Sequence, residues 1–210
     1  MYQNRIVPID TIVAALWDSE PPRSAVGNIR THATGLRQAV GPSARLLNTS
    51  GGYRLDVPPL ACDHVLFEAE IAAARVAAAR GDHGRAADLL NSALGLWESD
   101  SAAVGVPRCG PLARWLAHLE EERTRTVEDL AATYLRLNEP RAALHTLMEL
   151  LAESPLRSRA WALRMRAHHV LGELSGVTGA YFDADQVHRA ELGLPAGREL
   201  RELYAELIAG

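Results

Sequence analysis

Arginine side chains are concentrated near the beginning of the chain, between Arg23 and Arg54. This stretch contains five arginines and no Asp or Glu, although the whole chain has 22 basic and 26 acidic residues. Guanidinium groups donate paired hydrogen bonds that fit phosphate oxygens and guanine edges. A stretch of this composition indicates contact with double-stranded DNA, and the alternative is an ordinary solvated surface.

A helix followed by a hairpin is expected to position these arginines. Ser24 is suited to cap a helix and Gly41-Pro42 to stop it, so we expect a helix over Ser24–Val40. Its buried stripe is expected to consist of Val26, Ile29, Ala33, Leu36 and Val40. Ser50-Gly51-Gly52 separates two short apolar runs and predicts a hairpin over Arg45–Val57. In a winged helix such a helix enters the major groove, and the hairpin reaches the flanking backbone or the minor groove.

The polar side of this helix supplies the candidate DNA contacts. Arg30, Thr34 and Arg37 lie one turn apart on it. The arginines would bind guanine edges or phosphates, and the threonine would contact a phosphate or a thymine methyl group. Arg45 and Arg54 would hold the DNA backbone, or would simply be exposed strand residues. The full set of predicted DNA-binding residues is Arg23, Asn28, Arg30, Thr31, Thr34, Arg37, Arg45 and Arg54.

A short helix is expected before this unit. Arg5–Val7 should be extended, and Pro8 can open a helix at its first position. The apolar face of that helix would be formed by Ile9, Ile12, Val13, Leu16 and Trp17. Pro21-Pro22 ends it, and Pro58-Pro59 closes the whole unit. We therefore predict a winged-helix DNA-binding domain at residues 1–57.

The rest of the chain is expected to be almost entirely helical. The predicted helices are Asp63–Arg80, Gly84–Trp97, Pro111–Leu137, Pro140–Glu153, Leu156–Leu171, Leu174–Leu192 and Arg198–Ile208. A weak repeat with a spacing of 34 residues relates Tyr134 to His168 and Asn138 to Gly172, and this is the tetratricopeptide period. The predicted fold class is mainly α: a partial winged helix-turn-helix, then an all-α TPR-like domain at 60–210.

Charge and composition narrow the class of function. Residues 1–57 hold six Arg against four acidic residues, and residues 58–210 hold sixteen Arg against twenty-two. This asymmetry suggests one surface for nucleic acid and another for protein. The chain has no lysine, which excludes a Walker-type phosphate loop and a Schiff-base lysine. Two distant cysteines and the absence of a leader or a long apolar run predict a cytoplasmic protein without a membrane span.

Catalytic, cofactor and metal sites are not predicted. Cys62, His64 and Cys109 lack a zinc-ligand spacing, and the adjacent His168-His169 cannot chelate one ion together on a helix. No acid, base and nucleophile constellation is present, so we predict that the protein is not an enzyme. The three later tryptophans could line a ligand groove, but their helical spacing favours core packing: Trp97, Trp115 and Trp161.

Several segments, in their order along the chain, resemble one family. The first part of the chain resembles an OmpR-like winged helix. The resemblance lies in Val7-Pro8-Ile9-Asp10 with Ala15-Leu16-Trp17, and in Ile29-Arg30-Thr31-His32 with Gly51-Gly52-Tyr53-Arg54-Leu55. Ser154-Pro155-Leu156-Arg157 and the closing Glu191-Leu192-Gly193-Leu194 resemble the bacterial transcriptional activator domain. Together they resemble the SARP family, the Streptomyces antibiotic regulatory proteins. The resemblance implies a pathway-specific activator, typically of an antibiotic or other secondary-metabolite gene cluster. Such an activator binds direct repeats near promoters and helps to recruit RNA polymerase through sigma factor or another subunit.

The chain departs from the family pattern at its start and in the recognition helix. Family members carry a four-stranded sheet and one more helix before the segment that matches Arg5–Val7, so we expect a truncated winged helix here. His32 replaces a common aromatic residue, and Gly35 a common basic one. Two hypotheses follow. The first is a sequence-specific DNA-binding activator whose helical domain dimerises or contacts the transcription machinery. The second is a DNA-binding-defective helical module that modulates full-length regulators.

Overall fold

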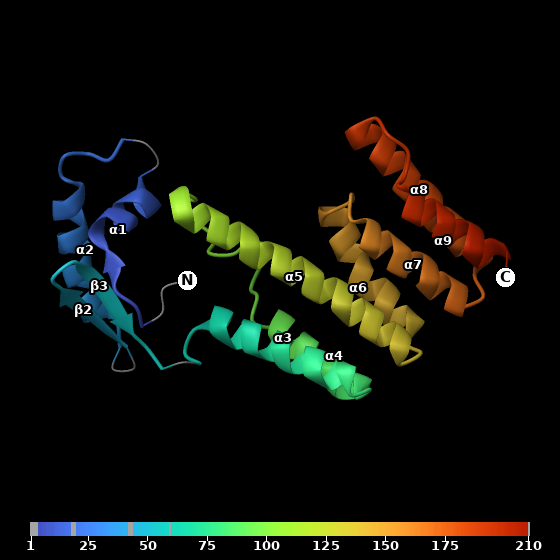
Figure 1. The fold of residues 1–210 in the computed structure, drawn as a ribbon, viewed down its shortest axis with the longest axis horizontal. Helices are drawn as coiled ribbons and strands as arrows, with labels where there is room; N and C mark the ends of the chain where they lie inside the picture. The colour runs from blue at the N-terminus through green and yellow to red at the C-terminus, as the bar shows by residue number, and fades with distance from the viewer. Residues whose placement is uncertain (1–3, 18–19, 42–43, 59, 210) are drawn as a thin grey trace. The chain divides into compact units, whose positions relative to one another are not determined.

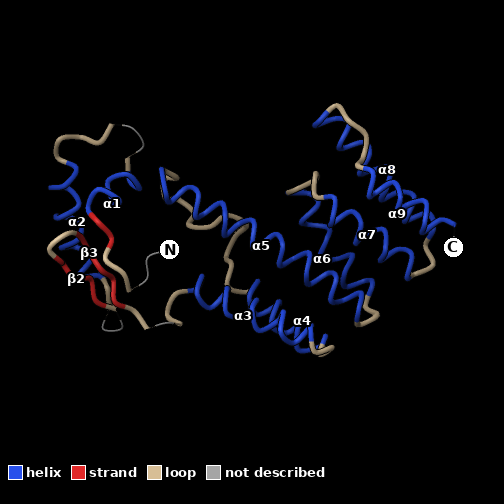
Figure 2. The backbone as a smooth tube through the Cα atoms, viewed as in Figure 1, coloured by secondary structure: helices blue, strands red, loops and turns tan. Residues whose placement is uncertain are grey.

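The fold was analysed in a computed structural model, which describes residues 4–17, 20–41, 44–58 and 60–209 (Figure 1). The chain divides into two compact units. Unit 1 contains Met1–Glu68 and Leu96–Glu122, and unit 2 contains Ala69–Gly95 and Arg123–Gly210. Helices dominate, and the strands are confined to the beginning of the chain (Figure 2). The predicted mainly α fold class is therefore confirmed.

Unit 1 begins with a small sheet and two helices. The sheet is antiparallel in the order β1-β3-β2, with β1 at Val7–Pro8, β2 at Arg45–Thr49 and β3 at Gly52–Asp56. Helices α1 (Ile9–Leu16) and α2 (Ala25–Ala39) pack beside it. Their core consists of Ile29, Ala33 and Tyr53, with partly buried Ile9, Ile12, Val13, Trp17 and Leu46 around it.

Glycine is required where β1 approaches β3. Pro8 pairs with Gly52, and a Cβ atom built on Gly52 would lie 1.9 Å from the Val7 carbonyl oxygen. Any side chain there would separate the two strands. The hairpin and the first strand therefore depend on this residue.

A second cluster completes unit 1. It lies in the loop after Gly95 and the first half of α5 (Gly110–Arg136), and Phe67 of α3 (Asp63–Ala79) packs on Trp97 there. The buried residues are Ala102, Leu116 and Leu119, and Trp97, Leu112 and Trp115 pack against them.

Unit 2 is built from helical hairpins. Its further helices are α4 (His83–Leu94), α6 (Pro140–Glu153), α7 (Ser158–Val170), α8 (Leu174–Leu192) and α9 (Arg198–Ala209). Gly81, Asn138 and Gly172 have φ angles of 80°, 58° and 73° at the turns that follow α3, α5 and α7. Each is followed by an amide that bonds a carbonyl five residues back: Asp82 to Ala77, Glu139 to Tyr134 and Glu173 to His168. This Schellman-type ending thus repeats at three helix-to-helix turns, which makes successive helical hairpins alike, as in a repeat architecture.

A buried ion pair joins α5 to the segment that begins α7. Glu128 is only 1% exposed. Arg157 donates to it from Nε at 3.0 Å and from Nη2 at 2.9 Å, and Arg159 approaches the same carboxylate at 3.5 Å. Arg159 also bonds Asp129 at 2.6 Å. The bidentate geometry satisfies both oxygens of a carboxylate that water does not reach.

Three details differ from the sequence-based expectations. Helix α4 ends at Leu94 rather than Trp97, because the Trp97 ring turns away to pack edge-to-face on Phe67 at 5.4 Å. Helix α7 begins at Ser158 rather than Leu156. Leu36 was expected in the buried stripe of α2 but is 54% exposed, since the core side of α2 is set by Ala25, Ile29 and Ala33. Among the described residues, no helix is long and apolar enough to cross a membrane.

Candidate nucleic-acid interface

The exposed side of α2 carries most of the predicted DNA contacts. Asn28, Arg30, Thr31, Thr34 and Arg37 are all exposed along it, opposite the buried alanine and isoleucine stripe. Within the part of the chain that the structure describes, the α2 helix and the hairpin up to Leu55 contain no carboxylate. The surface thus combines cationic and hydroxyl groups on one helix face, without an acidic group to repel phosphate.

The two threonines on this face are fixed by their own helix. Thr31 donates its hydroxyl hydrogen to the Gly27 carbonyl at 3.1 Å, and Thr34 donates to the Arg30 carbonyl at 3.0 Å. These bonds hold each side chain in one rotamer. The hydroxyl oxygens remain able to accept a hydrogen bond, and the methyl groups remain available for apolar contact with thymine.

Arg37 connects the helix to the hairpin. Its Nε donates to the Leu46 carbonyl of β2 at 3.0 Å, and its guanidinium carbon lies 5.8 Å from the centre of the Tyr53 ring on β3. A cation over an aromatic face is stabilised electrostatically. Arg37 therefore orients the hairpin relative to α2, while its remaining N–H groups can still face a ligand.

Arg54 has an acidic partner, Asp56, which was not expected from the sequence. Its Nε and Nη2 atoms lie 2.6 and 3.0 Å from the two oxygens of Asp56. Residues two apart on a strand lie on the same face, so the spacing of Arg54 and Asp56 in the sequence could have predicted this pair. Arg45 on β2 lies opposite Asp56 in the strand register and is exposed.

Arg23, Arg30 and Arg45 make no ion pair or side-chain hydrogen bond with any described residue. Arg23 precedes α2, Arg30 lies on its exposed side and Arg45 starts the hairpin. Of the five arginines in the basic stretch, these three are the ones whose guanidinium groups are available without breaking a contact. A Cβ atom on Gly35 would have no neighbouring atom within 4 Å, so the α2 surface carries no side chain at this position and is open to solvent there.

The other candidate chemistry is not assembled. No three His, Cys, Asp or Glu residues in the described ranges are grouped as a metal ion would need. Cys62 and Cys109 are free thiols, and His168 bonds Glu173 at 2.8 Å. Trp161 is core, at 4% exposed, with its Nε1 donating to the Pro155 carbonyl at 2.7 Å. Trp97 and Trp115 are only partly buried.

Comparison with known proteins identifies the family. Residues 62–208 match the family described as "Bacterial transcriptional activator domain". The chain is 31% identical over 213 residues to Regulatory protein DnrI of Streptomyces peucetius, covering 97% of this chain and 78% of DnrI. The chain belongs to the SARP family of regulators. The family recognition made from the sequence is thereby confirmed.

Other SARP-family relatives and a solved structure match almost the whole chain. Regulatory protein AfsR of Streptomyces griseus is 32% identical over 207 residues, which is 98% of this chain but 21% of AfsR. The structure of Mycobacterium tuberculosis EmbR in complex with a low-affinity phosphopeptide has a TM-score of 0.88 at 26% identity, over 99% of this chain and 56% of that one. The chain therefore spans only about a fifth of the length of AfsR and a little over half of the EmbR chain. These relatives are named as regulators rather than enzymes.

Proposed function

We propose that this protein is a transcriptional activator that binds promoter DNA sequence-specifically through α2 and the β2–β3 hairpin. In this proposal residues 1–57 read the DNA, and residues 60–210 form the activator domain. The single observation that carries the proposal is the exposed face of α2, on which Arg30, Thr31 and Thr34 lie without an acidic neighbour and beside a hairpin with a free Arg45. The family and the names of the relatives support it.

Each side chain has a defined task in this proposal. Arg30 enters the major groove and bonds a guanine edge or a phosphate, and Thr34 supplies its methyl group to a thymine. Arg37 holds the hairpin against α2 through Leu46 and Tyr53, so that Arg23, Arg45 and Arg54 meet the backbone on either side. Asn28 and Thr31 complete the contact on α2.

The target is proposed from the family. It would be a pair of direct repeats upstream of a secondary-metabolite promoter in the cytoplasm, bound by two copies of the chain. The helical domain would then contact RNA polymerase, through sigma factor or another subunit. Its excess of acidic residues suits a protein partner rather than DNA.

The proposal is tested by selecting duplexes from a random library with the 210-residue chain and measuring their affinity by fluorescence anisotropy. We expect a motif repeated about one helical turn apart. Affinity should fall steeply between ~50 and ~200 mM salt, because phosphate contacts release counterions. Failure to enrich any motif with the folded chain would contradict the proposal.

Arg30→Ala gives the residue-level test. Loss of a base contact should cost ~1–3 kcal/mol and relax one base position, whereas loss of a phosphate contact should weaken all sequences evenly and lower the salt slope by about one. Arg166→Ala is the matched control, since Arg166 is also exposed, on α7, and makes no hydrogen bond or ion pair with a described residue. Equal binding by the wild type and Arg30→Ala would remove Arg30 from the interface.

One observation favours the alternative of a DNA-binding-defective module. Arg37 and Arg54, two of the five arginines, are already bonded to Leu46 and Asp56. If those bonds leave too few guanidinium groups to bind phosphate, the chain would bind no duplex but would still bind a full-length regulator. Co-sedimentation with such a regulator, in the absence of any selected DNA motif, would favour this second function.

A further inference from the structure

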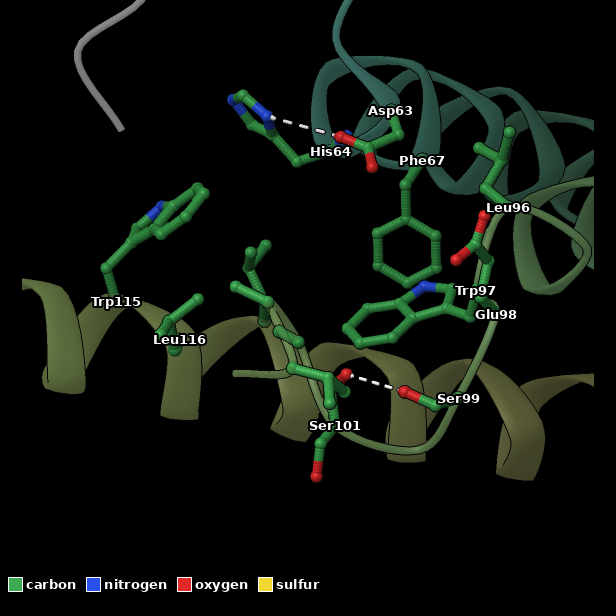
Figure 3. A pocket seen from close by; sticks show the side chains of 14 residues that line it. Asp63, His64, Phe67, Leu96, Trp97, Glu98, Ser99, Ser101, Trp115 and Leu116 are labelled. Carbon is green, nitrogen blue, oxygen red and sulfur yellow. Dashed lines mark hydrogen bonds and ion pairs between the residues drawn. The ribbon is translucent and has the colours of Figure 1, made fainter. Parts of the chain in front are cut away.

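Unit 1 contains a cavity that the DNA-binding proposal does not use. It lies between the first turn of α3, the loop after Leu96 and the first half of α5, and its volume is about 540 Å³ (Figure 3). Small-molecule sites in proteins have volumes of roughly 300–1,000 Å³. All the lining residues belong to unit 1.

Aromatic rings form the walls of this cavity. Phe67 and Trp97 pack edge-to-face at 5.4 Å with an interplanar angle of 74°, and His64 meets Trp115 at 5.1 Å and 87°. Figure 3 shows the Phe67 and Trp97 rings together at the centre of the view, with Trp115 on the helix across from them. A further aromatic group prefers the same offset or perpendicular packing.

The charges around the cavity are negative. Its lining includes the carboxylates Asp63 and Glu98 but no arginine. Glu98 has no hydrogen bond or ion pair with a described residue, and Asp63 is 81% exposed at the rim. Burial lowers the pKa of His64, which favours the neutral form of its ring.

The loop that covers the cavity is held by one carboxylate of α5. Glu120 accepts from the Ala102 amide at 2.9 Å and from both terminal nitrogens of Arg108. Arg108 also donates to the Ala102 carbonyl at 3.2 Å. These bonds fix Ala102, one of the residues that line the cavity, to helix α5.

We propose that this cavity binds a small aromatic amine. The ligand's ring system would pack between Trp97 and Trp115, and its protonated amine would face Glu98 and Asp63. A carboxylate or phosphate ligand is disfavoured because the lining contains no cation to pair with it. A cation beside tryptophan faces and carboxylates gains from both.

Two probes with the same ring system test the charge requirement. 1-Naphthylmethylamine is a cation at pH 7 and 1-naphthylacetate is an anion. Both are titrated into the full chain without DNA, and the indole N–H signals of the four tryptophans are followed by NMR. We expect the amine to shift the signals of Trp97 and Trp115 with a dissociation constant on the order of 0.1–1 mM, as a ligand of this size allows. Trp17 and Trp161 serve as internal controls.

Glu98→Gln is the discriminating variant. It should weaken binding of the amine by up to about fivefold, the range for an exposed ion pair. Glu206→Gln, which changes an exposed carboxylate on α9, should leave the affinity unchanged. The proposal is overturned if the amine shifts no signal up to about 10 mM. It is also overturned if the acetate binds as well as the amine, or if Trp17 and Trp161 respond in place of Trp97 and Trp115. None of these outcomes bears on DNA binding.

Discussion

The buried pair of Glu128 and Arg157 predicts an unequal response to removal of its two partners. Glu128 is 1% exposed, whereas the Arg157 side chain is 26% exposed and the Arg159 side chain 50% exposed. Arg157→Met leaves a carboxylate in a place that water does not reach. Glu128→Gln leaves two arginines that can each turn partly to solvent. The first substitution should therefore cost more than the second.

The expected magnitudes follow from these exposures. Arg157→Met leaves Glu128 only the longer contact to Arg159 at 3.5 Å, so it should lower the free energy of unfolding by ~3–5 kcal/mol, the range for removing one partner of a buried pair. Glu128→Gln keeps the shape and one accepted hydrogen bond, so it should cost ~1–2 kcal/mol, toward the low end for a bond to a charged group. Arg159→Met removes a half-exposed pair and should cost ~0–1 kcal/mol.

Urea unfolding followed by circular dichroism at 222 nm measures all three variants and the double variant Glu128→Gln, Arg157→Met. The double variant leaves no unpaired charge, so it should be more stable than Arg157→Met alone. If Glu128→Gln costs as much as Arg157→Met or more, the reasoning from burial is wrong. A double variant whose cost equals the sum of the single costs would refute the pairing itself.

Three further predictions concern single contacts. A Cβ atom on Gly176 would lie 2.3 Å from Nδ1 of His168, so Gly176→Ala should destabilise the protein by ~1–3 kcal/mol. A Cβ atom on Gly179, in the same helix, would meet nothing within 4 Å, so Gly179→Ala should stabilise the protein by up to ~1 kcal/mol. Thermal melts measure both variants. The hydrogen bond from Arg108 lowers the pKa of Glu120 below its ordinary value of 4.5. The ionised Glu120 carboxylate therefore contributes its full stabilisation above pH 4.5, and this stabilisation is lost as the pH falls through the lower pKa of the folded state. Tryptophan fluorescence titrated downward from about pH 5 should show a transition that Glu120→Gln abolishes. Gly52→Ala should separate β1 from β3 and abolish DNA binding in the anisotropy assay, while the helical signal at 222 nm is largely retained.

The helical part of the fold was predictable because its stop signals are local. Helices α6 and α8 begin and end at the predicted residues, Pro140–Glu153 and Leu174–Leu192. Proline at the first position opens α6, and Gly193 with a φ angle of 69° ends α8. These signals act within one turn of the chain, so no tertiary contact is needed to recognise them.

The end of α4 was not predictable in the same way. Its apolar spacing continues to Trp97, but the helix stops at Leu94, before Gly95. Trp97 instead packs on Phe67, which lies thirty residues earlier in the chain. Trp97 and Trp115 therefore both line the aromatic cavity and are only partly buried, whereas their helical spacing had favoured core packing. A pairing of rings from three segments leaves no periodic signal in the sequence.

The basic stretch shows what a count of charges leaves out. Five arginines with no acidic residue between them predict one uniform cationic surface, yet their partners differ. Arg54 shares a strand face with Asp56, which lies just beyond the acid-free stretch, and the strand register also brings Arg45 opposite Asp56. Arg37 is held by a backbone carbonyl and a tyrosine ring from the hairpin. Arg37 and Arg54 must each break a contact before all their N–H groups can bind DNA, whereas Arg30 has no such contact to break. The proposed interface therefore depends on the arginines that have no such contact, and Arg30→Ala should weaken DNA binding more than Arg54→Ala.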